Sequence, residues 1–324
     1  MEFGSLKILE RDNTPEEQLR NKVDVLAKSA WKDKWASDSD TLTPWLNNFN
    51  EDERLMALYL LSHFVYFDAG CIKEMLIKAY EDYVRRPIIF KIREKHNHTI
   101  NETFIEKEYS KMLRHVRFLC LGNPSESSAL MLYFFRQENN IPLELFISVD
   151  TLFEHKEVNE EMVAILQTDD INQIIVLDDF CASGSQASKF SDKYVSYIKK
   201  KAPQIEVSYV SLVGTCTSRE VLNKSKMFDK LKYCITLDET YRLYNDKSRY
   251  WGNIAEYEFC KEDVISMCGK YGNRLSPKYP NGYKDGQLMI GFFHNTPNNT
   301  IPIFWSESDG WNPIFKRYHK IYKL

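Results

Sequence analysis

The stretch IIVLDDFCASGSQASKF, residues 174–190, has the pattern of a strand, a turn and a helix start. Its first four residues are apolar and predict a buried strand, and the small residues at 182–185 predict a loop that leads into a helix near Ser185. Asp178 and Asp179 then stand at the carboxyl end of the strand. Ligands of parallel α/β sheets bind at this end, so the stretch predicts a binding site as well as a strand.

Strand and helix patterns alternate on both sides of this stretch. The expected strands are VRFLCLG, LELFISV, IIVL, VSYVSLVG and KYCITL, and the expected helices between them are SALMLYFFRQ, a segment near NEEMVAIL, SQASKFSDKYVSYIKK and SREVLNKSKMFDKL. Such alternation is typical of βαβ units. The predicted class is therefore an α/β fold with a doubly wound, mostly parallel sheet.

The flanking regions have different patterns. Residues 1–110 are expected to be a helical N-terminal region, with helix starts at Thr14 and Asn50, a helix that stops before Pro87 and a loop over 91–102. Residues 111–324 are expected to form the α/β domain. Its last part, about 275–324, mixes aromatic residues with Asn, Gly and Pro and predicts a hairpin or cap packed against the sheet.

Composition limits the classes of function. Hydrophobic residues make up 43% of the 324-residue chain, and the net charge of −3 gives no reason to expect a nucleic-acid or membrane partner. The apolar run at 55–67 is too short to span a bilayer. Seven scattered cysteines without a CxxC pair predict reduced thiols in a cytoplasmic protein, and neither zinc nor haem is expected. The stretch MEFGSLKILERD lacks a basic region followed by an apolar core, so no signal peptide is expected.

The chemistry of residues 178–186 indicates a ligand with both hydroxyl and phosphate groups. The small residues of the loop, Ala182, Ser183, Gly184 and Ser185, let backbone amides approach a phosphate, and the helix that follows directs N–H groups and its positive dipole end toward it. Carboxylates are poor phosphate ligands. They are good acceptors for ribose hydroxyls, and they can hold Mg²⁺ through water.

An apolar strand, two aspartates, three residues and then Ser-Gly resemble the phosphoribosyl-diphosphate motif of type I phosphoribosyltransferases. The resemblance implies that Asp178 and Asp179 bind the ribose hydroxyls and act in catalysis, with Mg²⁺ held by both acids. It also implies that residues 182–185 and Gln186 bind the 5′-phosphate. The family's pyrophosphate loop would correspond to the residues after the first strand: Gly122, Asn123, Ser125, Glu126, Ser127 and Ser128.

Together with DGQLMIGFFHNTPNNTIPIFW (285–305), these motifs make the chain similar to a divergent phosphoribosyltransferase-like group of bacterial conflict and anti-phage systems. Three features depart from the active family members. Gln186 replaces a Thr or Ser, Glu126 places an acid in the pyrophosphate loop, and residues 150–166 predict an acidic helix instead of a basic loop that closes over substrate.

Several alternatives remain open from the residues alone. The two acids can be purely structural, Cys181 can be a nucleophile or a buried thiol, and His294 can line a pocket under the cap. The leading function is an enzyme or sensor that binds phosphoribosyl diphosphate or a nucleotide, with transfer or hydrolysis at the anomeric carbon as its chemistry. The main alternative is a non-enzymatic nucleotide sensor whose helical N-terminal region contacts a protein partner. A third is a nucleic-acid-processing protein whose aromatic cap stacks bases.

Overall fold

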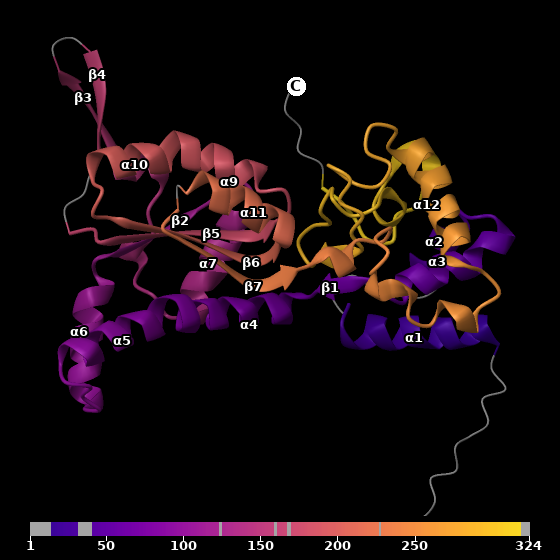
Figure 1. The fold of residues 1–324 in the computed structure, drawn as a ribbon, viewed down its shortest axis with the longest axis horizontal. Helices are drawn as coiled ribbons and strands as arrows, with labels where there is room; N and C mark the ends of the chain where they lie inside the picture. Colours follow the sequence, from indigo (N-terminus) through magenta and orange to yellow (C-terminus); the bar gives the residue numbers. More distant parts are fainter. Residues whose placement is uncertain are drawn as a thin grey trace, which may run out of the picture. The chain divides into compact units, whose positions relative to one another are not determined.

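The computed structural model describes residues 14–31, 41–122, 125–158, 161–166, 170–226 and 228–318. It divides the chain into two compact units (Figure 1), of which the first combines residues 1–68 with 240–324 and the second is formed by residues 69–239. The division differs from the boundary at residue 110 expected from the sequence. The N-terminal helices share their hydrophobic core with the C-terminal segment, and such long-range packing leaves no local signal in the sequence.

The second unit contains a four-stranded, entirely parallel sheet in the order β2-β5-β6-β7. The sequence predicted each of these strands as an apolar run. Their bounds are β2 (Val116–Cys120), β5 (Gln173–Cys181), β6 (Glu206–Thr215) and β7 (Lys230–Leu237). With helices on both faces (Figure 1), the unit has the predicted doubly wound α/β architecture.

Each face of the sheet is covered by its own helices. Side chains of Ile174, Val176 and Tyr209 pack against α9 (Ser185–Phe190), α10 (Ser196–Lys201) and α11 (Cys216–Ser225). A π-helical turn at Glu81–Arg85 joins α4 (Ala69–Tyr80) to α5 (Arg86–Lys95). A second one, at Ser191–Val195, joins α9 to α10. On the opposite face α7 (Ser127–Glu138) packs against β2 and β5, and α4 packs against α7 and β6.

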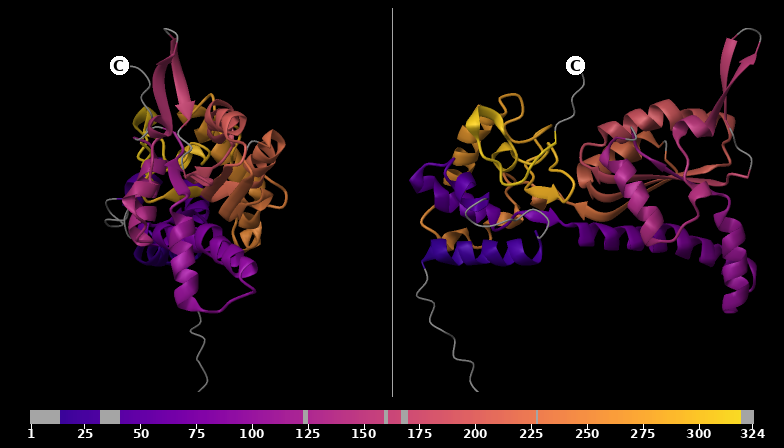
Figure 2. Two further views of the ribbon diagram at one scale, coloured as in Figure 1. Left: turned by 90° about the vertical axis from the view of Figure 1, so that its left-hand side faces the viewer. Right: turned by 180° about the vertical axis from the view of Figure 1, so that it is seen from behind.

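Residues 149–158 and 161–166 form a short helix and two paired strands, so the predicted acidic helix is wrong. The hairpin consists of β3 (Phe153–Val158) and β4 (Glu161–Leu166) after α8 (Val149–Leu152), and it extends away from the four-stranded sheet (Figure 2). The run VAIL fits a strand as well as a helix, and antiparallel pairing with β3 selects the strand. The predicted strand near 143–149 is reduced to a 3₁₀ turn and a single bridge at Phe146.

The helix predicted to stop before Pro87 continues through it. Pro87 stands in the first turn of α5, directly after the π-helical turn, where a missing N–H is tolerated. Helix α5 extends to Lys95 and α6 (Glu102–Leu113) follows, so only residues 96–101 of the predicted loop are non-helical.

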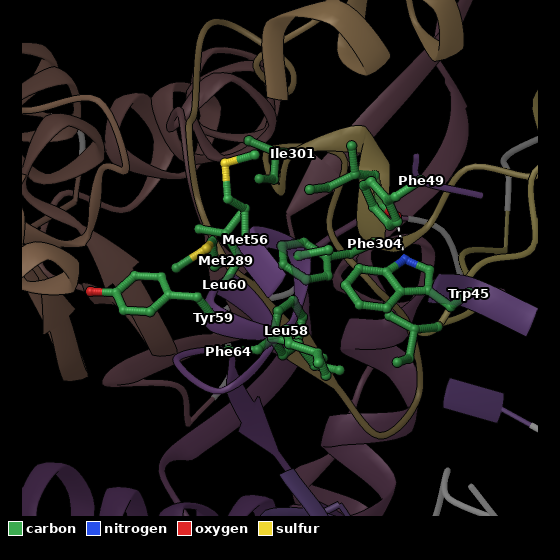
Figure 3. Packing of buried hydrophobic residues seen from close by; sticks show 14 of the residues in the cluster. Trp45, Phe49, Met56, Leu58, Tyr59, Leu60, Phe64, Met289, Ile301 and Phe304 are labelled. Carbon is green, nitrogen blue, oxygen red and sulfur yellow. Dashed lines mark hydrogen bonds between the residues drawn. The ribbon is translucent and has the colours of Figure 1, made fainter. Parts of the chain in front are cut away.

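The first unit is built around an aromatic core. Its elements are α1 (Pro15–Ser29), α2 (Thr43–Leu46), α3 (Arg54–Leu61), β1 (Val65–Phe67), α12 (Lys261–Leu275) and β8 (Ile290–Phe292). Thr14 caps α1 in a capping box with Glu17, as its sequence predicts. Figure 3 shows Trp45 and Phe49 packed with Phe304. The C-terminal part was expected to be a hairpin or cap packed against the sheet. Instead, β8 pairs with β1 in parallel, and Ile301, Ile303 and Phe304 join the core of the first unit. None of the described helices is long and apolar enough to cross a membrane.

Candidate functional site

The direction in which strands are added to the sheet reverses beside β5. After β2 the chain first returns to the other edge of that strand, where Phe146 bridges Phe118 in parallel, and only then crosses to β5, β6 and β7. A reversal of this kind leaves a crevice outside the carboxyl ends of the two diverging strands, and doubly wound sheets bind ligands there. The predicted site residues follow these two strand ends.

Asp178 and Asp179 lie inside the last part of β5, because the strand runs on through Cys181. Both are nearly buried, with exposed fractions of 7% and 8%. The carboxyl side chains of Asp178 and Asp179 lie within hydrogen-bonding reach of each other. Each also has a hydroxyl donor of its own, which is Tyr209 on β6 for Asp178 and Ser127 at the start of α7 for Asp179.

Asp178 is held from within the sheet. The hydroxyl of Tyr209 donates to Oδ2 of Asp178 at 2.5 Å, and the backbone N–H of Asp179 donates to Oδ1 at 3.1 Å. Burial raises the pKa of Asp178 well above its usual range, and the neighbouring carboxylate of Asp179 acts in the same direction. The Tyr209 hydrogen bond opposes this shift without cancelling it, so the neutral form of Asp178 is favoured.

Asp179 contacts the start of α7. The hydroxyl of Ser127, the first residue of that helix, donates to Oδ1 of Asp179 at 2.9 Å. The carboxylate thus lies near the positive end of a twelve-residue helix dipole, which stabilises its charge. Ser127 belongs to the predicted pyrophosphate loop, and the structure brings this residue and the acid pair together.

The loop after β5 has the predicted small residues at its turn and is fastened from the neighbouring strand. Gly184 adopts a left-handed φ of +70°, which favours glycine, and α9 begins at Ser185. The hydroxyls of Ser183 and Ser185 lie 3.0 Å apart. Thr215 at the end of β6 donates to the carbonyl of Ala182 at 2.5 Å, so the loop backbone is fixed before any ligand arrives.

A hydroxyl cluster lies beneath this loop and surrounds Cys181. Ser218 donates to the carbonyl of Cys181 at 2.8 Å and lies 2.9 Å from the hydroxyl of Tyr233, and Tyr209 and Tyr233 both hydrogen-bond the thiol. Burial raises the pKa of the Cys181 thiol, and Asp178 adds to the shift. A buried thiol of raised pKa favours the structural interpretation of Cys181 over the nucleophilic one.

The loop after β2 begins at Gly122, whose φ of +89° is again left-handed. Ser128 anchors the end of this loop by donating to the carbonyl of Leu121. Glu126 stands directly before α7, and its Oε2 accepts a hydrogen bond from Nε2 of Gln186 at 2.6 Å. Ser125 is described in the same loop, and Asn123 lies outside the described residues.

Asp178 and Asp179 are the carboxylates expected to hold Mg²⁺ at this edge of the sheet. Among the described residues there is no group of three or more His, Cys, Asp or Glu side chains that would hold a metal ion. The carboxylate of Asp179 still offers hard oxygen ligands. One such carboxylate fits a magnesium ion that keeps most of its water ligands and is bound mainly by the phosphates of the ligand, which is how Mg²⁺ usually binds.

His294 belongs to the first unit. Its ring packs against those of Phe292 and Phe293, with centroids 5.5 and 5.0 Å away. His294 therefore packs against aromatic side chains of the first unit.

A parallel sheet with this reversal point and an acid pair beside a small-residue loop defines a divergent phosphoribosyltransferase-like domain. The chain belongs to the PRTase-CE family, whose model matches residues 42–317. The match spans both units and most of the chain. A search of the curated proteins finds no match.

The chain is similar to several solved structures, three of which are the following. The xanthine-guanine-hypoxanthine phosphoribosyltransferase of Helicobacter pylori is 8% identical, with 52% of this chain and 85% of that one covered and a TM-score of 0.27. The orotate phosphoribosyltransferase of Aeropyrum pernix is 13% identical, with 41% and 73% covered and a TM-score of 0.24. The AQ2163 protein of Aquifex aeolicus is 11% identical, with 71% and 86% covered and a TM-score of 0.28.

Sequence reasoning missed Tyr209 on β6 and the role of Ser127 at the start of α7 as hydrogen-bond donors to the two acids. It also missed Ser218 on α11 and Tyr233 on β7, which lie around Cys181. One signal for Tyr209 was present. A tyrosine in the middle of the apolar strand VSYVSLVG must find a partner for its hydroxyl, and a nearby carboxyl is a good acceptor.

Proposed function

We propose that the carboxyl edge of β2 and β5 binds a phosphoribosyl compound, either phosphoribosyl diphosphate or a nucleotide, together with Mg²⁺. One observation supports this most strongly. Two buried carboxylates stand at the reversal point of the sheet, directly before a small-residue loop that opens a helix. Buried acids at such a place are costly unless a ligand, a metal or hydrogen bonds balance them.

The two acids and the loop at residues 182–186 have different roles in this proposal. Asp179 accepts hydrogen bonds from the ribose hydroxyls, because Ser127 holds its carboxylate at the edge of the sheet. Asp178 takes the second hydroxyl. Residues 182–186 hold the 5′-phosphate through backbone amides and through the hydroxyls of Ser183 and Ser185.

The anomeric side of the ribose then faces the loop after β2, which contains Gly122, Glu126, Ser127 and Ser128. Transfer or hydrolysis at the anomeric carbon is the chemistry that the resemblance to phosphoribosyltransferases implies. Magnesium, bound through water to Asp178 and Asp179, would neutralise phosphate charge. The protein's own part is to orient the ribose and to place N–H donors around the phosphate.

The cellular role is proposed from the resemblance alone: an effector or sensor in bacterial anti-phage defence. In the non-enzymatic alternative, ligand binding is reported to a protein partner by the helical N-terminal region. A specific observation favours this sensor, because Glu126 and Gln186 are bonded to each other across the loops where a transferase would bind its diphosphate.

Calorimetric titration with phosphoribosyl diphosphate and Mg²⁺, and then with nucleoside monophosphates, tests the proposal. Binding in the micromolar range, about −8 kcal/mol, is expected for wild type with one or more of these ligands. It should disappear in the double variant Asp178→Asn/Asp179→Asn and persist in Asp192→Asn, which removes an exposed carboxylate from the helical segment after the loop. Absence of heat with every ligand would show that the acids serve the fold or a partner.

A further inference from the structure

The loops after β2 and β5 are bridged by one hydrogen-bonded pair. Glu126 precedes the first residue of α7, and Gln186 is the second residue of α9. Nε2 of Gln186 donates to Oε2 of Glu126 at 2.6 Å, a short bond as expected for a charged acceptor. The pair joins the loop proposed to hold the 5′-phosphate to the loop on the anomeric side.

This pair lies directly against the backbone at the end of β2. A Cβ atom added to Gly122 would stand 2.4 Å from Oε2 of Glu126 and 2.8 Å from Nε2 of Gln186, well inside van der Waals contact. The side chains of Glu126 and Gln186 therefore cover the backbone of Gly122, the residue of this loop that has no side chain. A diphosphate that approached Gly122 would meet a carboxylate before it met the backbone.

Two carboxylates lie at the start of α7. Glu126 accepts a hydrogen bond from Gln186 there, and Asp179 accepts one from Ser127. The pKa of the Cys120 thiol, at the last residue of β2, responds to burial and to nearby acids. Burial raises the pKa of its thiol, with further contributions from the carboxylates of Asp178 and Glu126. The helix dipole at α7 is thus complemented by protein carboxylates, which leaves little attraction for an additional polyanion.

The side of the 5′-phosphate has the opposite character. The loop there ends in Gly184, whose φ of +70° starts the helical segment, and the hydroxyls of Ser183 and Ser185 lie beside it. No acidic residue occurs between Phe180 and Gln186 in the sequence. One phosphate is therefore accommodated at β5, and a second phosphate group on the other side of the ribose is opposed.

We infer that this site selects phosphoribosyl ligands with a single 5′-phosphate, such as ribose 5-phosphate or a nucleoside 5′-monophosphate, over phosphoribosyl diphosphate. The inference rests on the proposed function and narrows its ligand class. Glu126 is the residue that determines this specificity, and Gln186 holds its carboxylate over Gly122. The site then recognises a product-like compound, as a sensor does.

The test is a set of calorimetric titrations of the full chain with ribose 5-phosphate, adenosine and uridine 5′-monophosphates, and phosphoribosyl diphosphate, each with and without Mg²⁺. Wild type is expected to bind one of the monophosphates at least about tenfold more tightly than the diphosphate, a difference of about 1.4 kcal/mol. Glu126→Gln keeps the size of the side chain and removes its charge. It should shift the affinity ratio about tenfold toward the diphosphate, and Glu126→Ala should do the same if the first variant folds poorly.

Glu94→Gln is the matched control, because it makes the same charge change at an exposed position of α5 and should leave the ratio unchanged. Tighter binding of the diphosphate than of every monophosphate by wild type would overturn the inference and leave the proposed function intact. Weaker diphosphate binding by Glu126→Gln would also overturn it, since Glu126 would then assist the diphosphate, for example through a metal. No heat with any of the ligands would remove the proposed function itself and the inference with it.

Discussion

The hydroxyl of Tyr209 on β6 donates a 2.5 Å hydrogen bond to Oδ2 of Asp178 on β5, in the interior of the sheet. The bond stabilises the ionised form of Asp178, while burial and the nearby Asp179 carboxylate stabilise the neutral form. Burial has the largest effect, so the pKa of Asp178 is raised. Burial likewise raises the pKa of Tyr209, with Asp178 second, so the phenol stays protonated and remains the donor.

The first prediction concerns the stability of Asp178→Asn as a function of pH. A carboxyl whose pKa is higher in the folded state binds its proton more strongly there than in the unfolded chain. Its contribution to stability is complete below the unfolded pKa, about 3.9, and is lost as pH rises through the folded pKa. Asparagine cannot ionise, so the unfolding free energy of Asp178→Asn should increase relative to wild type between pH 5 and pH 8.

Urea unfolding of both proteins at several pH values measures this difference, in which the contributions of all other groups cancel. Asp192→Asn, at an exposed position, is the control and should give a flat difference. A flat difference for Asp178→Asn as well would mean that Asp178 is ionised in the folded protein throughout this range.

The second prediction concerns the hydrogen bond from Ser127 to Asp179. Ser127→Ala removes the donor to Oδ1 of Asp179 and should lower the unfolding free energy by about 0.5–1.5 kcal/mol, as expected for one hydrogen bond. Because the bond also orients the carboxylate, we expect the affinity for the phosphoribosyl ligand to fall about tenfold. Ser110→Ala removes an exposed hydroxyl that bonds the carbonyl of Glu106 on α6, and it should change neither quantity. Equal ligand affinity in wild type and Ser127→Ala would exclude the orienting role.

The central strands and the acid–loop stretch were predictable because their signals are local. Residues 174–177 and 207–214 are apolar runs that a buried parallel strand requires, and the small residues at 182–185 mark a turn into a helix. The same is true of Thr14, whose capping box with Glu17 is visible in the sequence.

The remaining features depend on partners that are distant in the sequence. The hairpin at 153–166 requires the pairing of two strands whose residues also fit a helix, and the π-helical turn before Pro87 has no sequence rule that marks it. At the site, Tyr209 and Ser127 reach the acids only through strand register and helix placement. A pattern along one segment does not contain that information.

The third prediction tests the close approach of Tyr233 to Gly214. A Cβ atom at Gly214 would lie 2.3 Å from the Tyr233 ring, which is held in place by the Ser218 hydroxyl. Gly214→Ala should therefore lower the unfolding free energy by about 1–3 kcal/mol through overpacking. The cost should be smaller in a Tyr233→Ala background, because the two changes are coupled.

Gly269→Ala is the matched control for this substitution. Nothing lies within 4 Å of a Cβ at Gly269 in α12, so alanine there should raise the unfolding free energy by about 0.5–1 kcal/mol. Urea unfolding of the single and double variants measures all of these effects. Additive effects of Gly214→Ala and Tyr233→Ala would contradict the predicted contact.

The last prediction concerns the shared core of the first unit. Trp45 is fully buried, stacks on Phe304 with ring centroids 5.8 Å apart and donates from Nε1 to the carbonyl of Ile303 at 2.8 Å. Trp45→Ala should lower the unfolding free energy of this unit by about 3–5 kcal/mol. Trp45→Phe should cost less, because it keeps part of the ring packing and Trp311 also donates to the same carbonyl.

Because the described residues of 14–31 and 41–68 share one core with those of the C-terminal segment, the effect of Trp45→Ala should reach α12, which is far from Trp45 in the sequence. Hydrogen exchange followed by mass spectrometry should show reduced protection of α12 together with α1 and α3. Val25→Ala, at a residue of α1 whose side chain is 62% exposed, is the control and should leave exchange in α12 unchanged. If Trp45→Ala reduced protection in the N-terminal helices and left α12 fully protected, the two segments would be separate folding units and the boundary near residue 110 would have to be considered again.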